Sequence, residues 1–158
     1  METNASRFVA PDPANELKHP ENQALFARFK EDSRAAAPGK NPPWAIGYEA
    51  RAHSDLIAIL YGVISDSEIR NGSAYGRPVM ANRQGLVFAY AQGTHSIFLK
   101  LRGDMYAAAR QDGGRYDPTY GKDWIEFRVG GRVGGSAEGR ESMERWARIS
   151  YRDTLSIE

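Results

Sequence analysis

The stretch GLVFAYAQGTHSIFLKL, from Gly85 to Leu101, places two apolar runs around the short segment AQGT. Residues alternate between two faces within each run, which is the period of a β-strand. The first run has one face of Leu86, Phe88 and Tyr90 and an opposite face of Val87, Ala89 and Ala91. The second has one face of Ile97, Leu99 and Leu101 and an opposite face of Phe98 and Lys100. The stretch therefore predicts two strands joined by a turn.

The sequence predicts further elements before and after these two strands. RPVMANR (77–83) predicts a preceding strand, and Asn82–Gly85 supplies the residues of a turn. GDMYAAARQDGG (103–114) predicts a short helix that its glycines end. DWIEFRV (123–129) predicts a last strand. Its inward face is expected to hold Ile125, Phe127 and Val129, and its outward face Trp124, Glu126 and Arg128.

Three longer helices complete the expected elements. Ser54–Asp66 has a wide apolar face and should be largely buried. RESMERWARISYRDTL (140–155) is amphipathic and ends the chain. Pro20–Arg34 carries apolar residues at helical spacing, and this apolar stripe is expected to pack on the main body.

The order of elements from residue 54 is helix, three strands, helix, strand, helix. Strands grouped in this way, with helices packed against them, predict an α+β fold with a mainly antiparallel meander sheet. Six of the eight prolines precede residue 54. We therefore expect residues 1–53 to form an N-terminal extension, with one helix and the proline-rich connector AAAPGKNPPW, and residues 54–158 to form a single α+β domain.

Composition narrows the function classes. The 21 basic and 20 acidic residues leave a net charge of +1, too small to favour nucleic acid or an anionic membrane by long-range attraction. Without cysteine there is no disulfide, thiolate metal site or cysteine nucleophile. The polar start, residues 1–18, does not look like a signal peptide, and no apolar run is long enough to span a membrane. We expect a cytoplasmic protein without a membrane partner.

Four short motifs resemble those of one known family. They are FAYA at Phe88–Ala91, FLKL at Phe98–Leu101, YDPTYGKDWIEF at Tyr116–Phe127 and SY at Ser150–Tyr151. Together with the order of elements, they make residues 54–155 or so similar to the MmcQ/YjbR-like family. The resemblance implies a CyaY-like, double-wing α+β fold. Members are often labelled as DNA-binding, a label that rests mostly on fold analogy, and the resemblance supplies no catalytic residue.

The loop GGRYDPTYGKDW (113–124) looks at first like a phosphate-binding loop. A P-loop needs four residues between its glycine and its Gly-Lys pair, followed by serine or threonine. Here six residues separate Gly114 from Gly121, and Asp123 follows Lys122. A carboxylate at that place repels phosphate, so the P-loop interpretation fails. Gly121 is instead expected to take a positive φ at the entry to the last strand.

Two interpretations of this loop remain open. In the structural one, Tyr116, Tyr120 and Trp124 pack together as a small aromatic cluster. In the functional one, the loop is a ligand-facing rim, with Arg115 and Lys122 as anion contacts and the aromatic rings as stacking surfaces.

The glycine-rich segment VGGRVGGSAEG (129–139) lacks the spacing of a dinucleotide-binding loop. It is expected to be a mobile loop, or alternatively a wing whose Arg132 and Arg140 contact a phosphate backbone.

Catalytic and metal-binding patterns are weak. The three histidines, His19, His53 and His95, lack the spacing of zinc ligands. His95 is expected to lie at a strand end with a local hydrogen bond, and it is the acid–base candidate only by default. The sequence His53-Ser54-Asp55 is no catalytic triad, because a triad is a spatial arrangement. We expect no catalytic residue, metal or cofactor.

The leading hypothesis is a non-enzymatic binding or interaction module of unknown ligand, with a protein partner left open. The alternative is a nucleic-acid-binding protein of double-wing type, and the third is a small enzyme that uses His95. The candidate ligand or nucleic-acid surface consists of Lys100, Arg115, Tyr120, Lys122, Trp124, Arg128 and Arg132.

Overall fold

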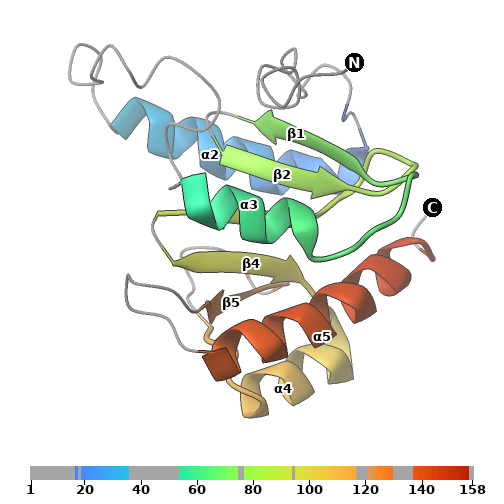
Figure 1. Ribbon diagram of the computed structural model, residues 1–158. Helices are drawn as coiled ribbons and strands as arrows, with labels where there is room; N and C mark the ends of the chain where they lie inside the picture. The colour runs from blue at the N-terminus through green and yellow to red at the C-terminus, as the bar shows by residue number, and fades with distance from the viewer. Residues whose placement is uncertain are drawn as a thin grey trace.

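The computed structural model describes residues 17, 19–35, 54–74, 77–93, 95–116, 121, 123–129 and 137–156. They form a five-stranded antiparallel sheet with helices on both of its faces (Figure 1). The expected α+β class with a meander sheet is therefore confirmed.

The sheet follows the chain without a crossover. Its strands are β1 (Arg70–Ala74), β2 (Arg77–Ala81), β3 (Val87–Gln92), β4 (Ser96–Lys100) and β5 (Trp124–Arg128), in the spatial order β1-β2-β3-β4-β5. The predicted strands correspond to β2 through β5. Strand β1 was not predicted, because its sequence RNGSA consists largely of turn-forming residues. It pairs with β2 over its whole length, from Arg70 opposite Ala81 to Ala74 opposite Arg77.

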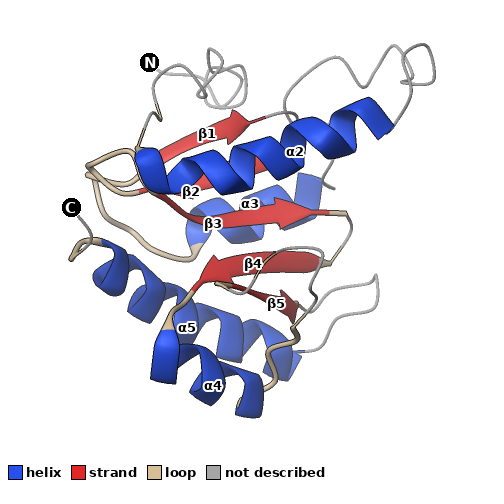
Figure 2. Ribbon diagram, turned by 180° about the vertical axis from the view of Figure 1, so that it is seen from behind, coloured by secondary structure: helices blue, strands red, loops and turns tan. Residues whose placement is uncertain are grey.

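The helices are the 3₁₀ turn η2 (Pro20–Asn22), α2 (Gln23–Ala35), α3 (Ser54–Gly62), α4 (Gly103–Gln111) and α5 (Ala137–Thr154). The predicted helix over residues 20–34 corresponds to η2 followed by α2. Helix α3 ends at Gly62, four residues before the predicted end, and α5 begins three residues before the predicted start. Helices α3, α4 and α5 lie on one face of the sheet, and α2 lies on the other (Figure 2).

The first core lies between the sheet and helices α3, α4 and α5. Two neighbouring residues of α5 attach this helix to the central strands. The Ser150 hydroxyl is placed to donate to the Phe88 carbonyl at 3.2 Å and to the Lys100 carbonyl at 2.7 Å. The Tyr151 ring packs 5.2 Å from the Phe88 ring, and its hydroxyl donates to Asp66 at 2.9 Å. The SY motif therefore joins α5 to β3, β4 and the segment after α3.

The second core lies under α2. Phe29 meets the edge of Tyr90 at 4.9 Å between ring centroids, and Tyr90 in turn contacts Phe98 at 4.7 Å and Trp124 at 5.1 Å. The apolar stripe of α2 thus packs on the main body, as predicted. Trp124 lies on the predicted face of its strand, but the prediction that it points outward is wrong, because this face is covered and Trp124 is only 7% exposed.

A buried asparagine fixes the start of α2 against the sheet. The Asn22 side-chain amide donates to the carbonyls of Leu17 at 3.0 Å and Gly85 at 2.8 Å. Its side-chain oxygen accepts the backbone N–H of Val87 at 2.9 Å. One side chain therefore satisfies three backbone groups and sets the position of α2 at the beginning of β3.

A β-bulge in β3 places Phe88 and Tyr90 in different cores. Val79 lies opposite Tyr90 and Met80 opposite Ala89, but Ala81 lies opposite Val87, so Phe88 is the extra residue. A bulge re-aims the side chains of its strand. Phe88 consequently packs in the core with α5, whereas Tyr90 packs under α2. The predicted common face of Leu86, Phe88 and Tyr90 is therefore wrong.

We predict that Phe29→Ala lowers the free energy of unfolding by about 3–5 kcal/mol, because it leaves a cavity against Tyr90. Lys30→Ala, on the exposed side of the same helix, should change it by about 0.5 kcal/mol or less. Chemical denaturation of both variants checks the expectation. Equal, small effects would show that α2 does not pack on the sheet.

We predict that Ser150→Ala lowers the free energy of unfolding by about 1–3 kcal/mol, because a buried hydroxyl that bridges two strand carbonyls is lost. Thermal and urea unfolding measure the change. Ser156→Ala, which removes an exposed hydroxyl near the end of the same helix, is the control and should be nearly neutral.

Candidate functional site

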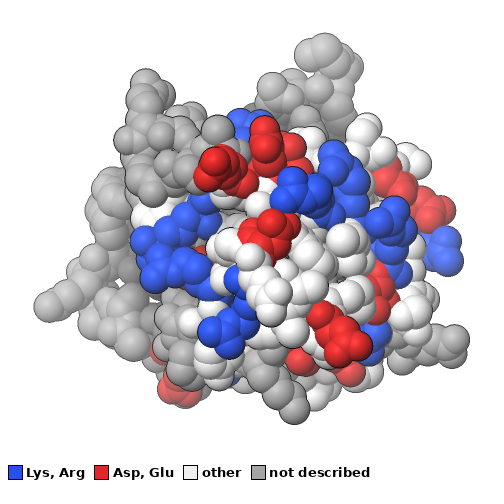
Figure 3. All heavy atoms as spheres, turned by 90° about the horizontal axis from the view of Figure 1, so that it is seen from below, with Lys and Arg blue, Asp and Glu red and all other residues white. Residues whose placement is uncertain are grey.

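The face over α4 and α5 carries charges of both signs. Figure 3 shows basic and acidic residues interspersed across it, without a uniformly positive area. Several of these charges form ion pairs, including Arg102 with Asp153 at 3.0 Å and Arg145 with Asp112 at 2.8 Å.

The seven predicted surface residues do not gather in one place in the described part of the chain. Arg115 and Arg128 are exposed beside β5. Lys100 and Trp124 are buried under α2, at the opposite end of the β4–β5 pair. Tyr120, Lys122 and Arg132 lie outside the described residues.

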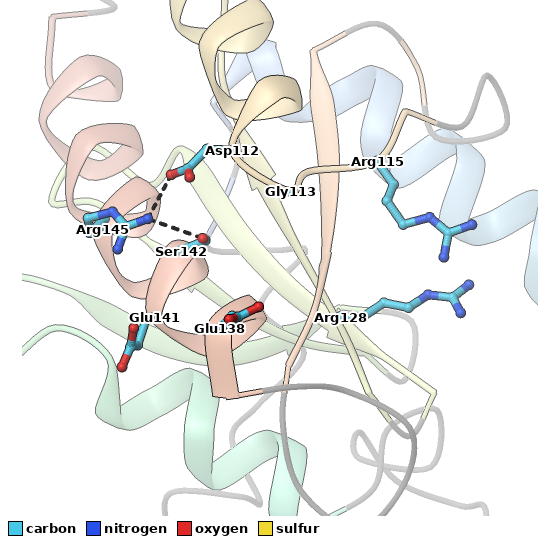
Figure 4. Close-up of a pocket in the computed structure, with 9 residues that line it drawn as sticks. Asp112, Gly113, Arg115, Arg128, Glu138, Glu141, Ser142 and Arg145 are labelled. Atoms are coloured by element: carbon cyan, nitrogen blue, oxygen red, sulfur yellow. Dashed lines mark hydrogen bonds and ion pairs between the residues drawn. The ribbon is translucent and has the colours of Figure 1, made fainter.

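Backbone pairing brings Arg115 and Arg128 together. Arg115 donates its N–H to the Glu126 carbonyl at 2.8 Å and accepts the Glu126 N–H at 2.9 Å, which makes an isolated antiparallel bridge beside β5. Paired residues of antiparallel strands share a face, as do residues two apart along one strand. Figure 4 shows the resulting arrangement, in which the Arg115 and Arg128 side chains extend side by side, away from α5.

A pocket of about 480 Å³ adjoins these two arginines. Its walls come from the end of α4, from β5 and from the first turns of α5. Glu138 and Glu141 belong to the α5 wall, across β5 from the arginines (Figure 4). Sequence reasoning missed this wall, because the alternating charges of α5 look like an ordinary solvated face.

Two guanidinium groups of this pocket already have carboxylate partners. Arg145 donates to Asp112 at 2.8 Å and to the Ser142 hydroxyl at 3.1 Å. The Arg128 Nε lies 3.5 Å from a Glu126 oxygen, which also accepts the Ser96 hydroxyl. In contrast, no carboxylate within the described ranges pairs with Arg115.

The Asp112 carboxylate links α4 to α5. It accepts a hydrogen bond from Arg145 and another from the Trp146 indole at 2.9 Å. These two donors, Arg145 first, hold the Asp112 pKa below its ordinary value of 3.8. The same pairing raises the pKa of Arg145. Arg145 therefore supports the pocket wall and is not available to a ligand in this arrangement.

Lys100 lies in different surroundings. Its side chain is 5% exposed, and its ammonium lies 3.6 Å from Glu21 and 3.9 Å from Asp123. It also sits 5.6 Å from the centroid of the Trp124 ring. Lys100 shares the strand face of Phe98, as predicted. The sequence could not show that η2 places Glu21 beside Lys100, or that α2 covers this part of the sheet.

The predicted aromatic cluster does not form between its two described members. The Tyr116 ring meets the edge of Tyr106 at 6.1 Å and lies under the Arg110 guanidinium. Trp124 instead contacts Tyr90 under α2. The two rings have different surroundings: Tyr116, next to the bridge residue Arg115, lies beside α4, whereas Trp124 lies under α2. Gly121, before the strand, has a φ of +89°, as expected.

The histidines occupy local structural positions. His95 lies just before β4, at a strand end as predicted, and its carbonyl accepts the N–H of Val129 at 2.9 Å, a backbone bond between distant segments. His19 accepts the N–H of Glu21 at the start of η2, and His53 lies outside the described residues. Among the residues that the structure describes, no group of three or more potential metal ligands occurs.

Comparisons of the chain with protein-family models, curated proteins and solved structures found no match. In the described ranges, no helix has the length and apolar character that crossing a membrane requires.

We predict that Asp112→Asn destabilises the protein near neutral pH and that its effect shrinks in acid. A carboxylate whose pKa is lower in the folded state stabilises that state above its unfolded pKa, and this contribution is lost as pH falls through the folded value. The difference in melting temperature between wild type and Asp112→Asn should thus narrow below about pH 4. Glu31→Gln, which removes an exposed carboxylate on α2, is the control variant.

Proposed function

We propose that this protein is a non-enzymatic binding module that holds an anionic group of its ligand between Arg115 and Arg128. The observation that carries the proposal is the position of the two guanidinium groups. They lie side by side on an exposed part of the sheet, and Arg115 has no carboxylate partner within the described ranges.

The chemistry of arginine supports an anion at this place. The two arginines carry two positive charges, and the single Glu126 carboxylate beside Arg128 leaves a net positive charge that an anion neutralises. Each guanidinium also presents a planar set of donors that matches the oxygens of a carboxylate or phosphate. The adjoining pocket lies on the other side of β5, with Glu138 and Glu141 on its α5 wall, so the two guanidinium groups hold the anion outside it.

An extended nucleic acid fits these surroundings less well. Lys100 lies under α2 with Glu21 and Asp123, and Arg145 is paired with Asp112. A phosphate backbone laid across the face in Figure 3 would meet carboxylates as well as cations. These features support recognition of one anionic group and not of a row of phosphates.

We also propose that the chain is related to the MmcQ/YjbR-like proteins whose motifs it resembles. The motifs FAYA and FLKL supply strands β3 and β4, and the SY motif holds α5 to them through Ser150 and Tyr151. The antiparallel meander and the terminal helix agree with the order of elements on which the resemblance rests. The structural roles of these motifs support the relationship, but they assign no function.

The proposal is tested by nuclear magnetic resonance of the arginine Nε–H groups during a titration with inorganic pyrophosphate. We expect saturable shifts at Arg115 and Arg128 and none at Arg152, an exposed arginine of α5. Arg115→Ala should weaken binding about tenfold, which corresponds to about 1.4 kcal/mol, whereas Arg152→Ala should not.

A parallel titration with duplex DNA at about 50 and 200 mM salt distinguishes the nucleic-acid alternative. Weak DNA binding that depends on Arg115 and Arg128 and on no other basic residue agrees with the proposal. Tight binding with a steep salt dependence that needs several basic residues would replace it with a phosphate-tracking surface. Absence of shifts at both arginines with pyrophosphate would also contradict it.

A further inference from the structure

A second pocket, of about 210 Å³, lies where the first turns of α2 meet the ends of β4 and β5. Its apolar side includes Leu25 and Trp124. Its charged side chains are Glu21, Arg28, Lys100 and Asp123. Two cations and two carboxylates thus surround a space that is large for a single water molecule, whose share of liquid volume is about 30 Å³.

Lys100 is the unusual member of this pocket. Its ammonium carries three N–H donors, and no described residue accepts a hydrogen bond from it. Glu21 and Asp123, at 3.6 and 3.9 Å, are ion-pair partners beyond direct hydrogen-bond length. Because both ion pairs are longer than a direct hydrogen bond, the Lys100 ammonium keeps N–H donors that an oxygen of a ligand in the pocket can accept.

The balance of charges selects the kind of molecule that supplies this oxygen. A simple anion would bind Lys100 but would also face Glu21 and Asp123. A simple cation would face Lys100 and Arg28. A molecule with both a carboxylate and an ammonium group meets each with its opposite.

We propose that this pocket binds a small zwitterion of the α-amino acid class. Its carboxylate accepts hydrogen bonds from Lys100, and its ammonium group pairs with Glu21 and Asp123. Arg28, which approaches Gly121 at the pocket, adds a second cation for the carboxylate. The apolar side chain of the ligand lies against Leu25 and Trp124.

This site is separate from the arginine pair. Lys100 pairs with Trp124 at one end of β4 and β5, whereas Ser96 pairs with Arg128 at the other end. Arg115→Ala should therefore leave the zwitterion site unchanged, and failure of one proposal does not affect the other.

The test uses three small molecules that differ by one charged group. L-valine carries both charges, isovalerate lacks the ammonium group, and isobutylamine lacks the carboxylate. The indole N–H resonance of Trp124, assigned with Trp124→Phe, reports binding. We expect a saturable shift with L-valine and binding at least about tenfold weaker with the other two molecules.

Variants connect the shift to the charged groups. Lys100→Met keeps the apolar stem but removes the ammonium, and it should abolish binding without lowering the melting temperature. Lys30→Met, on the exposed side of α2, should bind L-valine normally. Glu21→Gln changes a half-exposed group and should weaken binding of L-valine but not of isovalerate.

Three results would overturn the proposal. One is the absence of a saturable Trp124 shift with L-valine. Another is binding of isovalerate as strong as that of L-valine, which would make the pocket a site for simple carboxylates. The last is unchanged binding by both Lys100→Met and Glu21→Gln.

Discussion

The β-bulge at Phe88 is the constraint on which the rest of this structure depends. Without it, Phe88 and Tyr90 would lie on the same face of β3, two residues apart. The extra residue turns Phe88 toward α5 and leaves Tyr90 toward α2. Each face of the sheet thereby receives one large aromatic side chain from β3, whose burial contributes about 1.5–3 kcal/mol. The core under α5 thus includes Phe88, and the core under α2 includes Tyr90.

The cover provided by α2 also decides which charged residues remain accessible. This helix packs over Tyr90, Phe98 and Trp124, and Lys100 is enclosed with them. At the other end of the same strand pair, Arg128 is exposed beside Arg115. One strand face thus carries a buried cation in a small pocket and, at its other end, two exposed arginines of which Arg128 contacts Glu126. The two binding sites that we propose follow from this difference, because α2 covers one end of the β4–β5 pair and leaves the other end exposed.

Sequence alone was sufficient where the local pattern was regular. The alternation of Ile97, Leu99 and Phe98 in β4 placed each residue on the correct face, because no bulge interrupts that strand. It was insufficient in β3, since nothing in FAYA marks the register shift opposite β2. Strand β1 was also missed, because its pairing with β2 overrides the turn preference of RNGSA.

The sequence predicted Arg115 and Arg128 but not the rest of the site, because long-range pairing and helix packing bring the site together. Arg115 and Arg128 come from segments whose pairing depends on a single backbone bridge with Glu126. The glutamates of the opposite pocket wall come from α5, and only the tertiary fold brings them near. Burial of Trp124 and Lys100 likewise depends on where α2 packs, which its apolar stripe does not specify.

The most direct test of this account is a nuclear Overhauser measurement on the aromatic rings. The account predicts contacts from Phe88 to Tyr151 and from Tyr90 to Phe29, whose ring centroids lie 5.2 and 4.9 Å apart. It predicts no contact from Phe88 to Phe29. Contacts from both Phe88 and Tyr90 to the same helix would contradict it, because both residues would then lie on one face of β3 and the bulge would be absent.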